Sequence, residues 1–216
     1  MSMKENNKFI KQGLSTMYDY ASGRFQQEML AARKEFDILV PVPPEDDAEM
    51  RSRLIMFSHW FLMDRASESG KTPADIFFHE NLLKLPYQEE ALYRALRISR
   101  ISIYSVKDRY DRHVAVDIAS DERFEFRMDE DIELQSSDEI MTMRFITMDN
   151  NTFLLASYAT HHYSTRAFIH TELSALDLFD RAAFSRKVFE LTALSIKSRK
   201  YTWIEPIKIY TGVTKL

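Results

Sequence analysis

Apolar residues in the first hundred positions of the chain recur every three or four residues, with polar residues between them. This spacing is the period of an amphipathic helix, whose apolar side chains line one face. In residues 14–39 the apolar positions are Tyr18, Phe25, Met29, Ala32 and Phe36. Pro41, Pro43 and Pro44 should end that helix, because proline lacks an amide donor and favours extended backbone.

Three more helices are expected before residue 100. One covers residues 45–65, where acidic residues suit a helix N-terminus and the apolar period continues. Thr72, Pro73 and Asp75 supply a capping hydroxyl, a first-turn proline and an acid, so a short helix should start there. The last helix covers residues 88–98.

At Ile101 the apolar period changes from about 3.6 to 2, which is the period of a strand with one buried face. Five such segments follow between residues 101 and 155, joined by short polar connections. Consecutive strands would most simply pair as an antiparallel meander, either a curled sheet or an SH3-like barrel. This stretch has no glycine, which argues against full closure, because strongly curled sheets commonly use glycines or bulges.

The helical period returns after His170 and predicts one long helix over residues 172–200. The tail that follows, residues 201–213, is too apolar to remain in solvent. We expect it to dock on the rest of the protein, for example as an extra strand.

The predicted fold class is therefore α+β, with N-terminal helices packed on a five-stranded antiparallel meander, followed by a long C-terminal helix and a docked tail. We divide the chain into a helical region 1–99, a β region 100–170 and a C-terminal region 171–216. The length allows the three regions to share one core, so one compact unit is expected.

Composition excludes several kinds of chemistry. The 216 residues contain no cysteine, so the chain has no disulfide, no thiolate nucleophile and no cysteine-held zinc or iron–sulfur site. The four glycines stand alone, so no glycine-rich loop can surround a phosphate as in P-loop or dinucleotide-binding proteins. The HExxH, GxSxG and SxxK motifs are missing as well. No cofactor is predicted, and a binding role is favoured over an enzymatic one.

The opening residues lack the apolar stretch of a signal peptide, and no apolar run approaches the roughly 18 residues of a membrane span. The lack of cysteine fits a reducing compartment. We therefore expect a soluble, cytoplasmic protein with no membrane partner.

Charge is distributed unevenly along the chain. Residues 108–139 hold twelve acidic residues against four arginines, a local charge of −8. Residues 181–216 hold eight basic residues against two acidic ones, a local charge of +6. Solvated faces of opposite sign explain such a pattern, and so does a surface that meets a charged partner.

The main candidate for a binding surface lies in the basic C-terminal region. It interleaves basic and aromatic side chains: Lys197, Arg199, Lys200, Tyr201 and Trp203. This combination suits an acidic protein partner or a second copy of the chain, and also phosphates and stacked bases. A sequence pI of about 5.9 argues against a strong non-specific nucleic-acid binder. We therefore expect a non-enzymatic binding or regulatory protein that acts through protein contacts, with nucleic-acid binding as the alternative.

A metal-dependent hydrolase is a further alternative, for which two groups of side chains are candidates. His162 and His170 belong to the densest histidine group, and imidazole binds divalent metals. Asp108, Asp111 and His113 lie between the first two predicted strands and offer ligands to a cation. Their spacing matches no known metal-binding loop, and aspartate is a common turn residue. Exposed or hydrogen-bonded side chains are the favoured interpretation, so no metal site is predicted.

The most hydrophobic of the predicted helices holds His59, Trp60, Phe61 and Asp64. His59 and Asp64 lie five residues apart, about 140° around the helix axis, so they should not form a catalytic dyad. Trp60 and Phe61 are expected to anchor the helices on the sheet.

Three short patterns give the chain a family resemblance. Residues 57–65 read F..WF..D, residues 99–106 read S..S.Y.V, and Asp117 with Ile118 ends a predicted strand. With these patterns, residues 20–160 resemble an uncharacterised bacterial protein family, similar to a domain that in some chains lies beside a SEC-C metal-binding motif. The resemblance implies helices followed by a sheet and a bacterial origin, and no established activity. The SEC-C metal site is not implied for this chain, because it has no cysteine.

Overall fold

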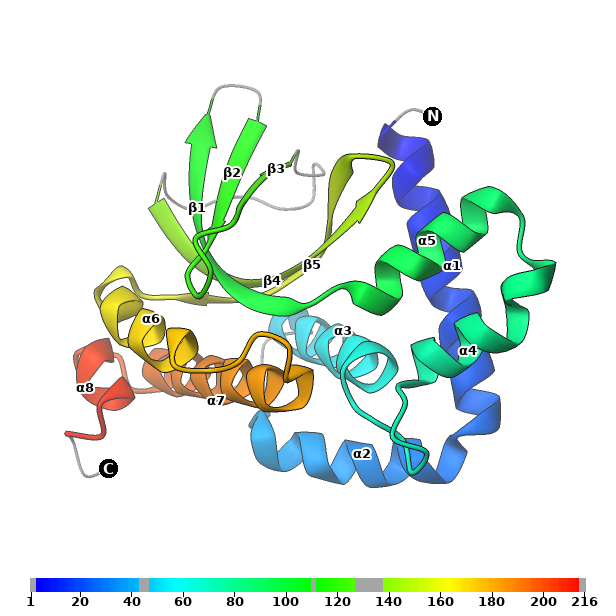
Figure 1. The fold of residues 1–216 in the computed structure, drawn as a ribbon. Coiled ribbons are helices and arrows are strands. Elements are labelled where there is room, and N and C mark those ends of the chain that lie inside the picture. The colour runs from blue at the N-terminus through cyan, green and yellow to red at the C-terminus, as the bar shows by residue number, and fades with distance from the viewer. Residues whose placement is uncertain (1–2, 43–46, 110–111, 127–137, 214–216) are drawn as a thin grey trace.

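The computed structural model describes residues 3–42, 47–109, 112–126 and 138–213 (Figure 1). Helices and one antiparallel sheet of five strands make up these residues, so the predicted α+β class is confirmed. None of the helices in these ranges combines the length and the apolar character needed to cross a membrane.

Helices occupy most of the first 98 residues. Their bounds are α1 (Met3–Arg24), α2 (Gln26–Leu39), α3 (Asp47–Met63), α4 (Pro73–Asn81), the 3-10 turn η1 (Leu82–Lys84) and α5 (Tyr87–Ile98). The single helix predicted over residues 14–39 is instead interrupted at Phe25, whose φ of −113° and ψ of 33° are not helical. The buried Phe25 ring packs edge-on against Tyr20, so the chain turns where this ring enters the core.

The start of α4 confirms the capping prediction. The Thr72 hydroxyl accepts a hydrogen bond from the Asp75 amide at 3.1 Å, and the Asp75 carboxylate accepts one from the Thr72 amide at 3.3 Å. Pro73 occupies the first turn, where its missing amide proton costs no helical hydrogen bond. This reciprocal pair determines where the helix begins.

The sheet departs from a simple meander at one connection. Its strands are β1 (Ile101–Arg109), β2 (Arg112–Asp117), β3 (Arg123–Phe126), β4 (Asp138–Met148) and β5 (Asn151–His161). The spatial order is β3-β2-β1-β4-β5, so β4 pairs with β1 and not with β3. Residues 101–106 and 139–146 are all buried, which suits central strands that are covered on both faces. This burial explains why β4 takes a place beside β1.

The sheet curls without any glycine because its β4–β5 pair is irregular. The pairing register shifts between Thr142 and Met143 and again between Arg144 and Phe145. Such bulges bend a strand and increase its twist. In this sheet, bulges therefore take the place of the glycines that curled sheets commonly use.

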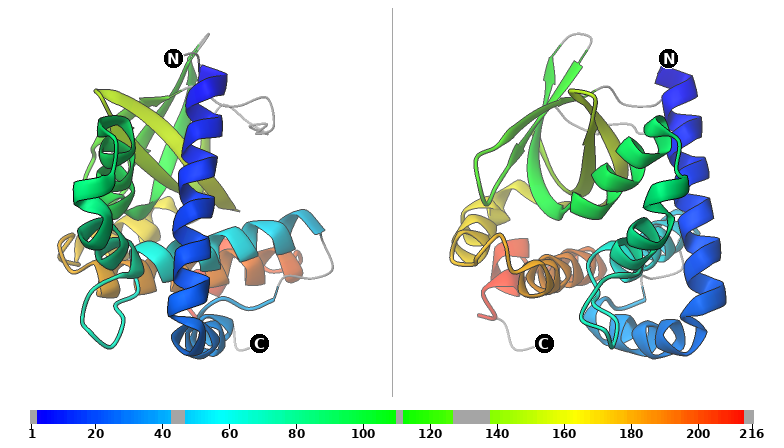
Figure 2. Two further views of the ribbon diagram at one scale, coloured as in Figure 1. Left: turned by 90° about the vertical axis from the view of Figure 1, so that its right-hand side faces the viewer. Right: turned by 45° about the vertical axis from the view of Figure 1, so that its right-hand side comes forward.

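Each face of the curled sheet carries its own core, and Figure 2 shows the helices that cover one of these faces. One face packs on α3 and on the C-terminal helix α7 (Arg181–Lys200), and Trp60 and Phe61 are buried there as predicted. The other face lies inside the curl and has a smaller cluster, formed by Tyr104, Val106, Ala115, Phe126, Met141, Met143 and Phe145.

After the 3-10 turn η2 (Tyr163–Thr165), the C-terminal region contains α6 (Arg166–Ser174), α7 and α8 (Pro206–Tyr210). The single helix predicted over residues 172–200 is therefore divided between the end of α6 and α7. The break occurs because Asp180 caps a new helix, its carboxylate accepting a hydrogen bond from the Ala183 amide at 3.0 Å. The tail docks as expected, but as α8 and not as a strand, with Ile209 and Tyr210 buried.

Candidate functional site

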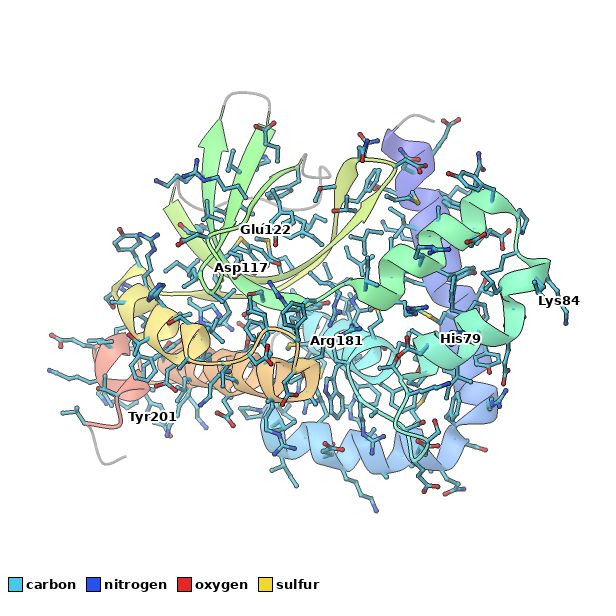
Figure 3. All side chains as sticks on the ribbon, viewed as in Figure 1. His79, Lys84, Asp117, Glu122, Arg181 and Tyr201 are labelled. Atoms are coloured by element: carbon cyan, nitrogen blue, oxygen red, sulfur yellow. The ribbon has the colours of Figure 1, made fainter. Side chains whose placement is uncertain are left out.

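Two arginines converge on one buried carboxylate between the sheet and the helices. The fully buried Arg144 of β4 donates to the Asp64 carboxylate and, at 3.1 Å, to the Ser99 carbonyl. Arg181, at the start of α7, lies 3.4 Å from the same carboxylate and donates to the carbonyls of Met63 and Ser99 at 2.7 Å (Figure 3). The cluster therefore joins the ends of α3 and α5 to β4 and α7, which is a structural role.

Two buried histidines are held neutral in the same layer. His59 Nδ1 lies 2.7 Å from the Tyr158 hydroxyl, and His161 lies 2.7 Å from the hydroxyls of both Thr142 and Tyr210. Burial, followed by the positive charge of Arg144, lowers the pKa of His59 to about 3. Burial, followed by the charge of an arginine in α7, lowers the pKa of His161 to about 3 as well. His59 and Asp64 have separate partners, so the expectation that they form no dyad is confirmed.

The side chains considered as metal ligands do not form one site among the described residues. His162 is exposed and its Nδ1 accepts a hydrogen bond from the Ser164 amide at 3.2 Å, while the exposed His170 lies one helix further along. His113 of β2 pairs with Asp108 of β1 through the backbone register, and Asp111 lies outside the described residues. Within the residues that the structure describes, no group of three or more metal-ligating side chains could hold an ion.

Part of the acidic region has a structural function. Asp117 is fully buried, and its carboxylate accepts hydrogen bonds from Arg100 at 3.1 Å and from the amides of Ala119 and Ser120 at 2.8 and 3.3 Å. It therefore closes the turn between β2 and β3, at the curl of the sheet seen in Figure 3. Residues 127–137, which hold four of the acidic side chains, lie outside the described residues.

The predicted binding residues of the C-terminal region do not all share one surface. Arg199 points to α3 and forms an ion pair with Glu49. Lys197 and Lys200 are exposed, and no carboxylate in the described part of the chain pairs with either of them. The Tyr201 and Trp203 rings meet edge-on with centroids 5.4 Å apart, and Trp203 is 76% exposed.

A groove of about 480 Å³ brings three of these residues together with apolar side chains. Lys197, Lys200 and Tyr201 line it at the end of α7 together with Leu194, and Val42 also lines it. Val42, which follows α2, is 60% exposed. We call this surface the C-terminal groove. The sequence indicated the lysines and the tyrosine, but nothing in it indicated that Val42 would line the same groove.

Comparison of the chain with protein-family models, with curated proteins and with solved structures finds no match. The structure defines an α+β protein with an apolar groove, and the two lysines of this groove pair with no carboxylate among the described residues.

Proposed function

We propose that this protein is a non-enzymatic binding protein whose C-terminal groove accepts an acidic segment of a partner protein. One observation supports this most directly: Lys197 and Lys200 face an apolar groove, and neither is neutralised by a carboxylate of the described residues. Nearby Arg199, by contrast, already has an acidic partner within the chain.

The groove has the two components of a protein-binding surface. Apolar walls at Val42, Leu194 and Tyr201 can take up an aliphatic or aromatic anchor, which supplies most of the binding free energy in such interfaces. The two lysines complement carboxylates on either side of that anchor, and charged groups of this kind increase association rate and specificity. The exposed Trp203 ring adds apolar surface next to Tyr201.

This proposal can be tested by phage display of random peptides. The parent protein is the target, and the double variant Lys197→Glu/Lys200→Glu is used for counter-selection. We expect enriched peptides to carry aspartate or glutamate around one apolar residue, and to bind the double variant roughly ten-fold more weakly or worse. The matched control Lys84→Glu/Arg186→Glu changes the net charge equally at exposed positions outside the groove, and should bind like the parent. Figure 3 shows Lys84 far from Tyr201.

Tryptophan fluorescence provides an independent reading of where the peptide binds. The chain has two tryptophans, and Trp60 is only 5% exposed, so a change in emission or in quenching by iodide should come from Trp203. A Trp203→Phe variant should lose that change while still binding the peptide. Enriched peptides that bind parent and double variant equally would contradict the proposal.

Two further measurements on the parent and the double variant would identify other occupants of the groove. A labelled single-stranded oligonucleotide whose binding is lost in the double variant and falls steeply with salt would assign the groove to nucleic acid instead. A parent protein that sediments as a dimer, with a monomeric double variant, would assign it to a second copy of the chain.

A further inference from the structure

A second hollow, of about 430 Å³, lies between the end of β2 and the segment η2–α6. It shares no lining residue with the C-terminal groove. From α6 and the turn before it, Tyr163, Arg166, Ala167 and His170 line the hollow. These positions are separated by three, four and seven residues, so they form one stripe along the helical segment. The short side chain of Ala167 leaves the hollow open between its larger neighbours.

The opposite wall combines apolar side chains with a carboxylate. Val116 and Ile118 come from the end of β2, and Asp121 comes from the turn that follows. Asp121 has a φ of 57°, in the left-handed region that only a few residue types adopt readily. Asp117 also lines this wall, but its carboxylate is already neutralised by Arg100. Asp121 therefore provides the free negative charge of the hollow.

Three ionisable side chains that line this hollow have no partner among the described residues. Arg166, His170 and Asp121 make no ion pair or hydrogen bond through their side chains with any residue that the structure describes. Most arginines in the described ranges do have acidic partners, including the exposed Arg24 and Arg94. The α6 wall of the hollow thus offers Arg166 and His170 to a ligand, and the β2 wall offers the Asp121 carboxylate.

From this arrangement we infer that the hollow, which we call the α6 pocket, binds a small zwitterionic molecule of the amino-acid class. Arg166 and His170 hold its carboxylate, and Asp121 holds its ammonium group. Val116, Ile118 and the Tyr163 ring contact the apolar part of the molecule. A volume of about 430 Å³ is within the usual size of small-molecule sites.

The two charged walls distinguish this ligand class from simpler ones. A ligand with only a carboxylate would leave Asp121 unpaired beside it, and a ligand with only an ammonium group would leave Arg166 unpaired. A molecule with both groups satisfies both walls. This inference is independent of the proposed partner-binding function, because the two surfaces have no residue in common.

Titration followed by ¹H–¹⁵N NMR tests the inference with three related probes. They are L-phenylalanine, 3-phenylpropionate, which lacks the ammonium group, and 2-phenylethylamine, which lacks the carboxylate. We expect L-phenylalanine at millimolar concentration to shift the amide signals of Ile118, Ala167 and His170. Each probe that lacks one charged group should bind roughly ten-fold more weakly or worse, because one charge-assisted hydrogen bond is lost.

Two variants test which side chains bind the carboxylate and the ammonium group of the ligand. Arg166→Gln should reduce the affinity for L-phenylalanine roughly ten-fold. The variant should then bind L-phenylalanine about as weakly as the parent protein binds 2-phenylethylamine, the probe without a carboxylate. Asp121→Asn should have the corresponding effect and keep the turn, because asparagine tolerates a positive φ. Arg186→Gln is the matched control, since Arg186 is an exposed arginine of α7 outside the pocket.

Several results would overturn the inference. Equal binding of L-phenylalanine and 3-phenylpropionate would show that the pocket takes an anion and not a zwitterion. Shifts confined to other parts of the protein, or no shift with any of the three probes, would show that the α6 pocket does not bind this class of molecule. Unchanged affinity in Arg166→Gln would remove the proposed carboxylate contact.

Discussion

Replacing Asp64 by asparagine should destabilise the protein strongly. The substitution keeps the shape of the side chain and removes its charge. Asp64 is the acidic partner of Arg144, and the side chains of both residues are almost completely buried. Arg181 approaches the same carboxylate from α7. In the variant, the Arg144 guanidinium therefore stays in the core without a counter-charge, and a second guanidinium lies nearby.

The burial of this ion pair sets the size of the expected loss in free energy of unfolding. Removing one member of a buried ion pair costs about 3–5 kcal/mol, because the remaining charge is no longer compensated. The asparagine carbonyl still accepts one hydrogen bond, so we expect a loss of about 3 kcal/mol. For a chain of this length, that loss lowers the melting temperature by roughly 6–12 °C.

Urea unfolding followed by circular dichroism measures the free energy of unfolding of parent and variants. Glu35→Gln is the control, because Glu35 pairs with Arg65 near the surface at 2.9 Å and such pairs contribute about 1 kcal/mol or less. The double variant Asp64→Leu/Arg144→Met should be more stable than Asp64→Asn, because it buries no unpaired charge at these two positions. A loss in Asp64→Asn no larger than that in Glu35→Gln would refute the electrostatic reasoning.

The remaining predictions concern pH and helix packing. The pKa values of His59 and His161 are lowered to about 3 in the folded protein, so below about pH 6.5 the unfolded state binds more protons and stability falls as the pH falls. As the pH falls to about 3, each histidine should lower the free energy of unfolding by up to about 1.4 kcal/mol per pH unit. Urea unfolding at a series of pH values should therefore show a shallower fall in this free energy for a His59→Gln variant than for the parent. Gly13→Ala should lower the melting temperature, because an added Cβ would clash with the Leu92 side chain, whereas Gly23→Ala meets nothing and should raise it through better helix propensity. Equal effects of the two glycine substitutions in a thermal melt would show that the close approach of α1 and α5 does not control packing there.

Most of the helical part could be read from local chemistry. Thr72 and Asp75 form their cap within four consecutive residues, and α2 ends just before Pro41, as predicted. The interruptions at Phe25 and Asp180 were not foreseen, because the apolar period continues across both positions. Phe25 interrupts the helix through its packing in the core, and Asp180 does so by capping α7. The period of apolar residues shows neither effect.

The candidate sites, like the helices, could be predicted only in part from the sequence. Lys197, Lys200 and Tyr201 could be selected from sequence because basic and aromatic residues alternate there, but the wall at Val42 comes from a segment more than 150 positions away. The sequence indicates neither Arg166 nor Asp121 as a site residue, and Asp121 stands out only as a turn residue in an acidic region. A single arginine or aspartate carries no pattern until the fold shows which residues face it.

The fold class, the type of most elements and the chemistry that requires cysteine or a glycine-rich loop can be assessed from the amino-acid sequence of this chain. The strand order, the buried pair of Asp64 and Arg144 and the two hollows become visible only in the folded protein. The difference comes from distance along the chain. Helix period, capping and turns depend on residues within a few positions of one another, whereas strand partners, compensated charges and pocket walls depend on contacts between segments that meet only after folding.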